Sequence, residues 1–300
     1  MGSKGKDAKA NEKQKLKAQI RKLEKQKKQL QKKIKKLKVG QQMAAPVQEA
    51  YPSPMKPGRY KNSYAPYRVI EVENLTPTVM RVLAEPAGPQ RLTSQGLMGE
   101  YLYLVTGKKG EVLPAAQLEK GRPRWQQPTS KTKYTVRSYR EETGALEINL
   151  VLHPGGAGAS WARQVKPGDL AHFMGPKSGY QISDDYDFYL LAGDETGLPG
   201  MARWLESMPY DARGAAFIEV AAESSQQVID APDGFDLIWV DASQPGALAE
   251  AVLSYPLPRG SICTWLAGEA GSLRPLRPWV RRELGVPKGH SYAKGYWKRK

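Results

Sequence analysis

The stretch that most constrains this chain runs from Asp187 to Glu206. Phe188–Ala192 is a short apolar run that Gly193 ends, and such a run predicts a buried strand. Residues 193–197 read Gly-Asp-Glu-Thr-Gly, which are turn residues, and Pro199 stands where a first helical turn tolerates proline. Apolar residues then recur at helical spacing. A strand, a tight turn and a helix therefore follow one another, and the free N–H groups at the helix start suit an anion such as phosphate. An ordinary turn without a ligand is the alternative.

Strands and helices alternate throughout residues 182–300. The predicted strands are Phe188–Ala192, Ala215–Ala221, Leu237–Val240 and Ser261–Ala267, and the predicted helices are 199–208, 246–254 and 272–284. This alternation predicts a parallel sheet covered by helices, which is an α/β nucleotide-binding domain.

Residues 59–181 follow a different pattern, because short strands succeed one another with few helical segments between them. The predicted strands are Arg68–Val72, Val79–Leu83, Glu100–Val105, Tyr134–Tyr139, Leu146–Leu152 and Asp169–Met174. Six short strands of this kind predict a six-stranded antiparallel β-barrel, so the predicted fold class is β + α/β.

Positive charge gathers at the N-terminus. Residues 1–40 carry a net +13 of the chain's +16, which leaves a nearly neutral body that needs no nucleic acid. Leu or Ile recur at heptad spacing over 10–39, and Lys27 alone interrupts this apolar stripe. A basic, coiled-coil-like helix is therefore expected at 1–40, with a Pro-rich linker at 41–58. Such a helix would self-associate weakly, touch an anionic membrane surface, bind nucleic acid or an acidic partner, or serve only as a solvated extension.

The composition excludes several classes of protein. No apolar run is long enough to cross a bilayer, and no apolar segment follows the Lys-rich start as a secretory signal requires. The single cysteine, Cys263, allows no internal disulfide, so a cytoplasmic location is expected. Three histidines without a CxxC or HExxH pattern predict no metal site.

Five motifs in sequence order resemble the siderophore-interacting proteins, which are FAD-dependent ferric-siderophore reductases of the ferredoxin-reductase superfamily. The matching segments are Lys133–Arg137, His153–Gly175, Ala192–Pro199, Trp265–Arg277 and Gly295–Arg299, and together they extend the resemblance over about residues 59–300. The first resembles the flavin motif R-x-Y-T-x-R, with Thr132 in place of the first arginine. Lys131 or Lys133 would supply that charge less specifically. Gly197 and Gly200 stand where the family usually has alanine.

The resemblance implies a role for each motif. Tyr134 would stack on the flavin ring, Thr135 would bond near the flavin N5 atom, and Arg137 would neutralise charge on the cofactor. The glycine-rich loop after His153 would let backbone N–H groups approach the pyrophosphate. The cofactor-binding residues implied in this way are Tyr134, Thr135, Val136, Arg137, His153, Gly158, Ala159, Ser160, Trp161, Ala162, Asp194, Thr196, Gly268, Glu269 and Trp297.

The implied activity is electron transfer from NAD(P)H through FAD to siderophore-bound Fe(III), with release of Fe(II) and no general acid or base. Ferric siderophores are often anionic, so basic side chains are expected to hold them. The candidates are Lys294, Lys298 and Arg299, with Arg81 and Lys131 as weaker ones. The choice between NADH and NADPH stays open. Two alternatives stay open as well: a general NAD(P)H:flavin oxidoreductase or electron-transfer flavoprotein, and a non-enzymatic binding protein tethered by the basic helix.

Overall fold

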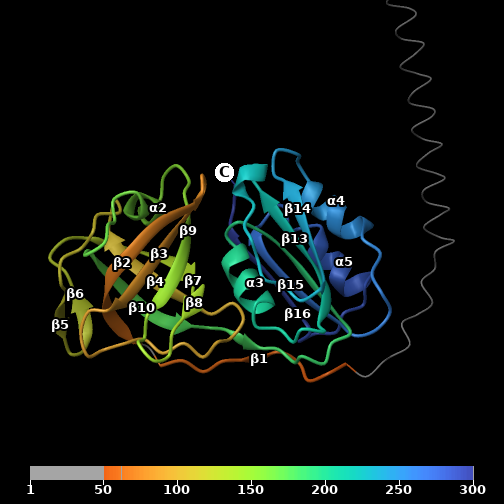
Figure 1. Ribbon diagram of the computed structural model, residues 1–300, viewed down its shortest axis with the longest axis horizontal. Helices are drawn as coiled ribbons and strands as arrows, with labels where there is room; N and C mark the ends of the chain where they lie inside the picture. The colour runs from red at the N-terminus through yellow and green to blue at the C-terminus, as the bar shows by residue number, and fades with distance from the viewer. Residues whose placement is uncertain (1–50, 62, 300) are drawn as a thin grey trace, which may run out of the picture. The chain divides into compact units, whose positions relative to one another are not determined.

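The computed structural model describes residues 51–61 and 63–299. The predicted helix at 1–40 and the first part of the predicted linker lie outside the described residues. Two bodies of secondary structure stand side by side within the described part, a β-rich one and an α/β one (Figure 1). No helix of the described residues is both long and apolar enough to span a membrane.

The β-rich body is a seven-stranded antiparallel sheet with the order β7-β4-β10-β2-β3-β9-β8. It stands where a barrel was predicted and is called the barrel below. Its strands are β2 (Tyr64–Thr76), β3 (Val79–Pro86), β4 (Tyr101–Gly107), β7 (Thr129–Thr135), β8 (Ser138–Tyr139), β9 (Leu146–Val151) and β10 (Leu170–Lys177). Alternate residues such as Leu102, Leu104 and Phe173 point into one core. Trp161 of helix α2 (Ala157–Ala162) completes that core with 1% of its surface exposed.

The prediction of six strands was wrong by one, because the segment 134–139 turns a corner. Val136 N still donates to Glu100 O beside β4, at 3.0 Å, whereas Arg137 N donates to Glu147 O of β9, at 2.8 Å. The chain therefore changes partner between adjacent residues, and one predicted strand becomes β7 and β8. A hairpin of β5 (Gln117–Glu119) and β6 (Arg122–Arg124), which the sequence analysis missed, forms a separate two-stranded sheet.

The α/β body is a five-stranded, all-parallel sheet with the order β14-β13-β12-β15-β16. Its strands are β12 (Phe188–Asp194), β13 (Arg213–Val220), β14 (Gly234–Asp241), β15 (Ile262–Glu269) and β16 (Ser291–Trp297). Its helices are α3 (Leu198–Leu205), α4 (Ala247–Ser254) and α5 (Leu276–Arg282), and a 3-10 turn, η1 (Glu223–Ser225), follows β13. The parallel sheet with helices on both faces confirms the predicted α/β architecture. Strand β16 was missed because its residues are half-exposed, as an edge strand allows.

Alternating strand residues place the helices on opposite faces of this sheet. Tyr189 and Leu191 pack in the core that holds α3, whereas Leu190 and Ala192 pack in the core that holds α4 and α5. Helix α3 consequently lies on the face toward the barrel, and α4 and α5 lie on the far face (Figure 1). Cys263 is fully buried in the α3 core, and burial raises the pKa of its thiol.

The described part of the predicted linker, residues 51–58, is packed against the rest of the chain. The ring of Tyr51 lies 4.7 Å from that of His290, and Met55 N donates to Gly289 O at 2.8 Å. Strand β1 (Lys56–Pro57) then pairs antiparallel with β11 (Tyr180–Gln181), the segment that joins the two bodies. This strap ties the α/β body to the segment that leaves the barrel.

Candidate functional site

The turn after β12 is organised by the carboxylate of Asp194. Its Oδ1 accepts from the N–H of Thr196 at 2.8 Å and from that residue's hydroxyl at 2.5 Å. Its Oδ2 accepts from the N–H of Glu269 at 2.8 Å and from the indole N–H of Trp297 at 2.7 Å. Four of the predicted site residues, which come from three distant motifs, therefore meet at the carboxyl ends of β12, β15 and β16.

Glycines allow these strand ends to approach one another closely. A Cβ atom at Gly193 or Gly197 would collide with the carbonyl oxygen of Ala267, and one at Gly268 would lie 2.8 Å from the Asp194 nitrogen. Gly197 stands where related motifs carry alanine, and here the backbone of β15 occupies the space of that methyl group. A Cβ at Gly200, by contrast, would make an ordinary 3.5 Å contact with Thr135.

Three further carboxylates surround this turn. Burial and the charge of Asp194 raise the pKa of Glu219. Burial also raises the pKa of Glu195, despite the hydrogen bond that it accepts from the Thr78 hydroxyl of the barrel. Burial opposes ionisation of Glu269 too, but the N–H groups of Arg299 and Ser272 donate to it and the net effect lowers its pKa. The turn therefore combines two carboxyl groups with a raised pKa, Glu195 and Glu219, and one with a lowered pKa, Glu269.

The barrel contributes strand β7 and helix α2. A Cβ at Gly158 would collide with the Tyr134 hydroxyl and would lie 3.1 Å from the Thr132 methyl group, so both side chains face α2. Burial raises the pKa of Tyr134. Thr135 points the other way and lines the seam between the two bodies. The ring of Tyr134, which was predicted to stack on a flavin, therefore lies beside Gly158 of α2.

The loop before α2 is shaped by two consecutive glycines. Gly155 and Gly156 have φ values of 76° and 89°, which favour glycine. His153 is exposed beside Gly156, with its Nδ1 atom 3.2 Å from Pro154 O. Ser160 is half-buried, whereas the other predicted residues of this group are core residues: Val136, Ala159, Trp161 and Ala162. Those four side chains are buried and present no side-chain group to a ligand.

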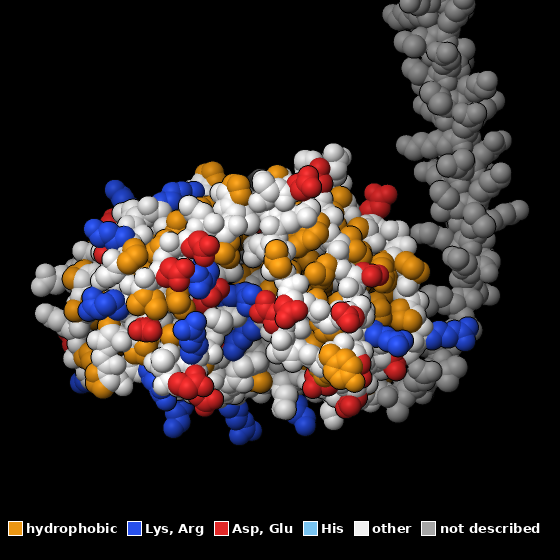
Figure 2. All heavy atoms as spheres, viewed as in Figure 1, with side chains coloured by type: hydrophobic (Ala, Val, Ile, Leu, Met, Phe, Trp, Pro, Cys, Tyr) orange, Lys and Arg blue, Asp and Glu red, His pale blue; other side chains and the backbone are white. Residues whose placement is uncertain are grey.

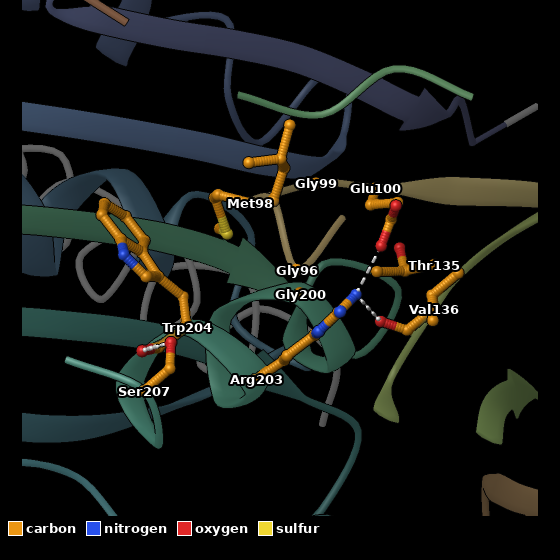
Figure 3. A pocket seen from close by; sticks show the side chains of 11 residues that line it. Gly96, Met98, Gly99, Glu100, Thr135, Val136, Gly200, Arg203, Trp204 and Ser207 are labelled. Carbon is orange, nitrogen blue, oxygen red and sulfur yellow. Dashed lines mark hydrogen bonds and ion pairs between the residues drawn. The ribbon is translucent and has the colours of Figure 1, made fainter. Parts of the chain in front are cut away.

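Two ion pairs join the barrel to the α/β body. The arginine of one pair belongs to the barrel, and the arginine of the other belongs to α3. The sequence analysis missed Glu206, Arg203 and Glu100. Arg137 of the barrel makes a two-point pair with Glu206, at 2.5 and 2.7 Å. Arg203 of α3 reaches back to Glu100 at 2.9 Å and to Val136 O at 3.0 Å, as Figure 3 shows. The recess beside Arg203, which Glu100 and Val136 also line, has room for about 10 Å³, which is about one water molecule. No local motif signals these pairs, since their partners lie 69 and 103 residues apart.

Arg137 was expected to neutralise charge on a cofactor, but its guanidinium is occupied by Glu206. Arg81 is likewise held, by Glu71, Glu73 and Glu147 at 2.8 to 3.1 Å. Lys294, Lys298 and Arg299 are exposed on β16 and after it, whereas Lys131 lies in a separate pocket of the barrel. Over the visible face of the body, acidic and basic side chains are mixed (Figure 2), in line with its small net charge.

Comparison with known proteins decides the family. A family model described as siderophore-interacting FAD-binding domain matches residues 68–180, and one described as siderophore-interacting protein matches residues 186–300. The chain is 30% identical over 255 residues to an uncharacterized protein of Mycobacterium tuberculosis, Rv2895c, and the match covers 78% of this chain and 89% of that protein. The chain belongs to the siderophore-interacting protein family.

Two named enzymes are among the relatives. The ferric vibriobactin reductase ViuB of Vibrio cholerae is 32% identical over 173 residues, which are 55% of this chain and 64% of that protein. The NADPH-dependent ferric-chelate reductase of Escherichia coli is 24% identical over 250 residues, which are 82% of this chain and 98% of that protein.

Solved structures agree with this placement. A siderophore utilization protein from T. fusca has a TM-score of 0.69 and 29% identity, and the match covers 82% of this chain and 95% of that one. The ferredoxin reductase of carbazole 1,9a-dioxygenase shares the fold at 17% identity, with a TM-score of 0.54 over 78% of this chain and 67% of that one. The barrel is thus a siderophore-interacting FAD-binding domain followed by a parallel α/β domain.

The residues of the barrel fit FAD in their chemistry. A largely buried tyrosine beside a glycine-rich turn offers an aromatic face and backbone N–H groups to a flat ring and a pyrophosphate. This strand lacks the motif's positive charge on the face toward α2. Thr132 occupies the place of the motif's first arginine, and Lys131 and Lys133 project from the opposite face of β7. Pyrophosphate binding would therefore depend on N–H groups more than on a cation of this strand.

Proposed function

We propose that this chain is a ferric-siderophore reductase that draws electrons from NAD(P)H and releases iron as Fe(II). Bound FAD would accept a hydride from the nicotinamide and pass its electrons singly to Fe(III). Siderophores hold Fe(III) through hard oxygen donors, which suit Fe(II) less well. The named relatives support the activity. The observation that carries it in this chain is that Thr135, of the strand predicted to bind flavin, and Gly200 of α3 line the same recess.

Each part of the site has a role in this proposal. Tyr134 would pack against the flavin ring, and the N–H groups of the loop at 155–158 would bind the pyrophosphate. The Asp194 turn would receive the nicotinamide end of the donor, and Trp297, fixed by its bond to Asp194, would cover the flavin. The exposed Lys294, Lys298 and Arg299 would attract an anionic siderophore. Arg81 is left out, since three glutamates already neutralise it.

The domain boundaries belong to the proposal as well. We place the FAD-binding domain at 59–181 and the NAD(P)H-binding domain at 182–300, after a basic segment at 1–40 and a linker at 41–58. We also propose a cytoplasmic location, which the single cysteine and the need for NAD(P)H support.

The first experiment is spectroscopic. The purified protein is expected to show flavin absorbance, which bleaches on anaerobic addition of NADH or NADPH and returns when a ferric siderophore is added with a ferrous-iron trap. A general flavin reductase would instead reduce free flavin and leave ferric siderophores untouched. A protein that takes up no FAD on reconstitution would point to the non-enzymatic alternative and end the proposal.

A further inference from the structure

A second hollow lies on the outer side of the barrel, at the base of the β5–β6 hairpin. It has a volume of about 510 Å³, which is in the range of pockets that hold small molecules. Its lining combines aromatic, apolar and basic side chains, drawn mainly from the segment 122–131 with Met174 of β10: Arg122, Pro123, Arg124, Trp125, Lys131 and Met174.

The aromatic wall of this pocket is held in place. The indole N–H of Trp125 donates to Pro114 O at 3.0 Å, and its ring stands edge-on to His172 at 5.0 Å and to Tyr64 at 6.1 Å. His172 is 1% exposed, and its two ring nitrogens lie 2.9 Å from the Tyr64 hydroxyl and 3.2 Å from Leu113 O. Burial lowers the pKa of His172, so the support behind Trp125 is neutral at pH 7.

The rim of the pocket is positively charged. Arg124 forms an exposed pair with Glu119 at 3.3 Å. Arg122 and Lys131 have no carboxylate within 4.0 Å among the residues that the structure describes. Two cations therefore stand unneutralised beside a rigid indole face, which is a combination that binds negative charge on a flat ring.

This pocket and the flavin residues lie on opposite faces of β7. Thr132 and Tyr134 face α2, whereas Lys131 and Lys133 project outward, because adjacent residues of a strand alternate. On the outward face, Lys133 Nζ lies 5.2 Å from the ring centre of Tyr101 and 5.7 Å from that of Tyr103. A basic and aromatic surface thus runs from the pocket along β7 and β4 toward the seam.

We propose that this pocket binds a planar aromatic anion, of the aryl carboxylate or catecholate class. The Trp125 ring would stack on the ligand's ring, and Arg122 with Lys131 would pair with its charge. Such an anion could come from an aryl arm of the ferric siderophore or from a free aromatic acid. The first source rests on the proposed function, and the second does not.

Calorimetric titration of the whole protein with salicylate tests the pocket. The double variant Arg122→Gln/Lys131→Gln is expected to bind salicylate about tenfold more weakly, since two charge-assisted contacts are lost. Lys166→Gln, which removes an exposed charge outside the pocket, serves as the matched control and should bind as the parent does. Uncharged benzamide should bind the parent poorly. No binding of salicylate to the parent at millimolar concentration, or equal binding by parent and double variant, would overturn the proposal.

Steady-state reduction identifies the source. If an aryl arm of the substrate occupies the pocket, the double variant should raise KM about tenfold more for a ferric catecholate siderophore than for ferric citrate. Unchanged KM values with weakened salicylate binding would assign the pocket to a free aromatic acid. Intact salicylate binding in a protein that reduces no ferric complex would reject the reductase function and keep the pocket.

Discussion

Thr132 is the residue at which this chain departs most from the flavin motif. It faces α2 beside Gly158, where a cation would meet a pyrophosphate held by the loop N–H groups. The variant Thr132→Arg is therefore expected to tighten FAD binding about tenfold, because one charge-assisted bond of about 1.4 kcal/mol is gained. Quenching of flavin fluorescence during titration of the apoprotein measures the change. Thr132→Gln is the control for size, and equal gains in both variants would contradict the role of charge.

Glu219 makes a second residue-scale prediction, which concerns pH. Its pKa lies above the ordinary value of 4.5 in the folded protein, so the folded state binds more protons than the unfolded state. The stabilisation is complete below pH 4.5 and is lost as the pH rises through the folded pKa. Glu219→Gln should make the decline shallower, because Glu195, whose pKa is also raised, still contributes. Urea unfolding between pH 4.5 and 7 checks it, and parallel pH profiles for parent and variant would show that Glu219 does not titrate in this way.

At the scale of elements, the seam between α3 and the barrel is bound by two unequal ion pairs. Glu100 has a fully buried side chain, so Arg203→Ala would leave an unpaired buried charge and cost about 3 kcal/mol of unfolding free energy. The Arg137–Glu206 pair is part-exposed, with 18% and 29% of the side chains accessible, and Arg137→Ala should cost about 1 kcal/mol.

Denaturant unfolding of the two variants gives these free energies, and equal losses would refute the ranking. Flavin affinity adds a second readout. Glu206→Gln keeps Arg137 but removes its partner. If Arg137 acts only through the seam, Arg137→Ala and Glu206→Gln should weaken FAD binding alike. If only Arg137→Ala weakens FAD binding, Arg137 contacts the cofactor directly.

The elements also show what the sequence reveals and what it hides. Local patterns were enough for β12, the turn at Asp194 and helix α3, because an apolar run, turn residues and helical spacing are encoded in twenty adjacent residues. The same logic missed β16, whose half-exposed residues lack an apolar run. It also missed Arg203 and Glu100, because their pairing exists only once two bodies meet. The split of β7 from β8 depends on Glu147, which is likewise remote in sequence.

At the scale of the whole molecule, most of the net charge and the candidate site belong to different segments of the chain. Residues 1–40 carry +13 of the net +16, whereas every candidate site residue lies between 81 and 299. Removal of residues 1–50 is therefore expected to leave flavin content and kcat unchanged, while binding to vesicles rich in anionic lipid falls at least tenfold. Vesicle sedimentation at two salt concentrations, with the reductase assay, measures both. Retained vesicle binding after truncation would show that residues 51–300 carry the lipid-binding surface.

The buried thiol of Cys263 has a practical consequence. It is the single cysteine of the chain, it is fully enclosed by the α3 core, and its raised pKa keeps it out of the reactive thiolate form. The native protein should thus be silent toward maleimides and Ellman's reagent until it unfolds. Cysteines introduced on either side of the seam would then be the sites that accept spin labels or fluorophores. The native chain already serves as a blank background for measuring whether its two halves move apart during turnover.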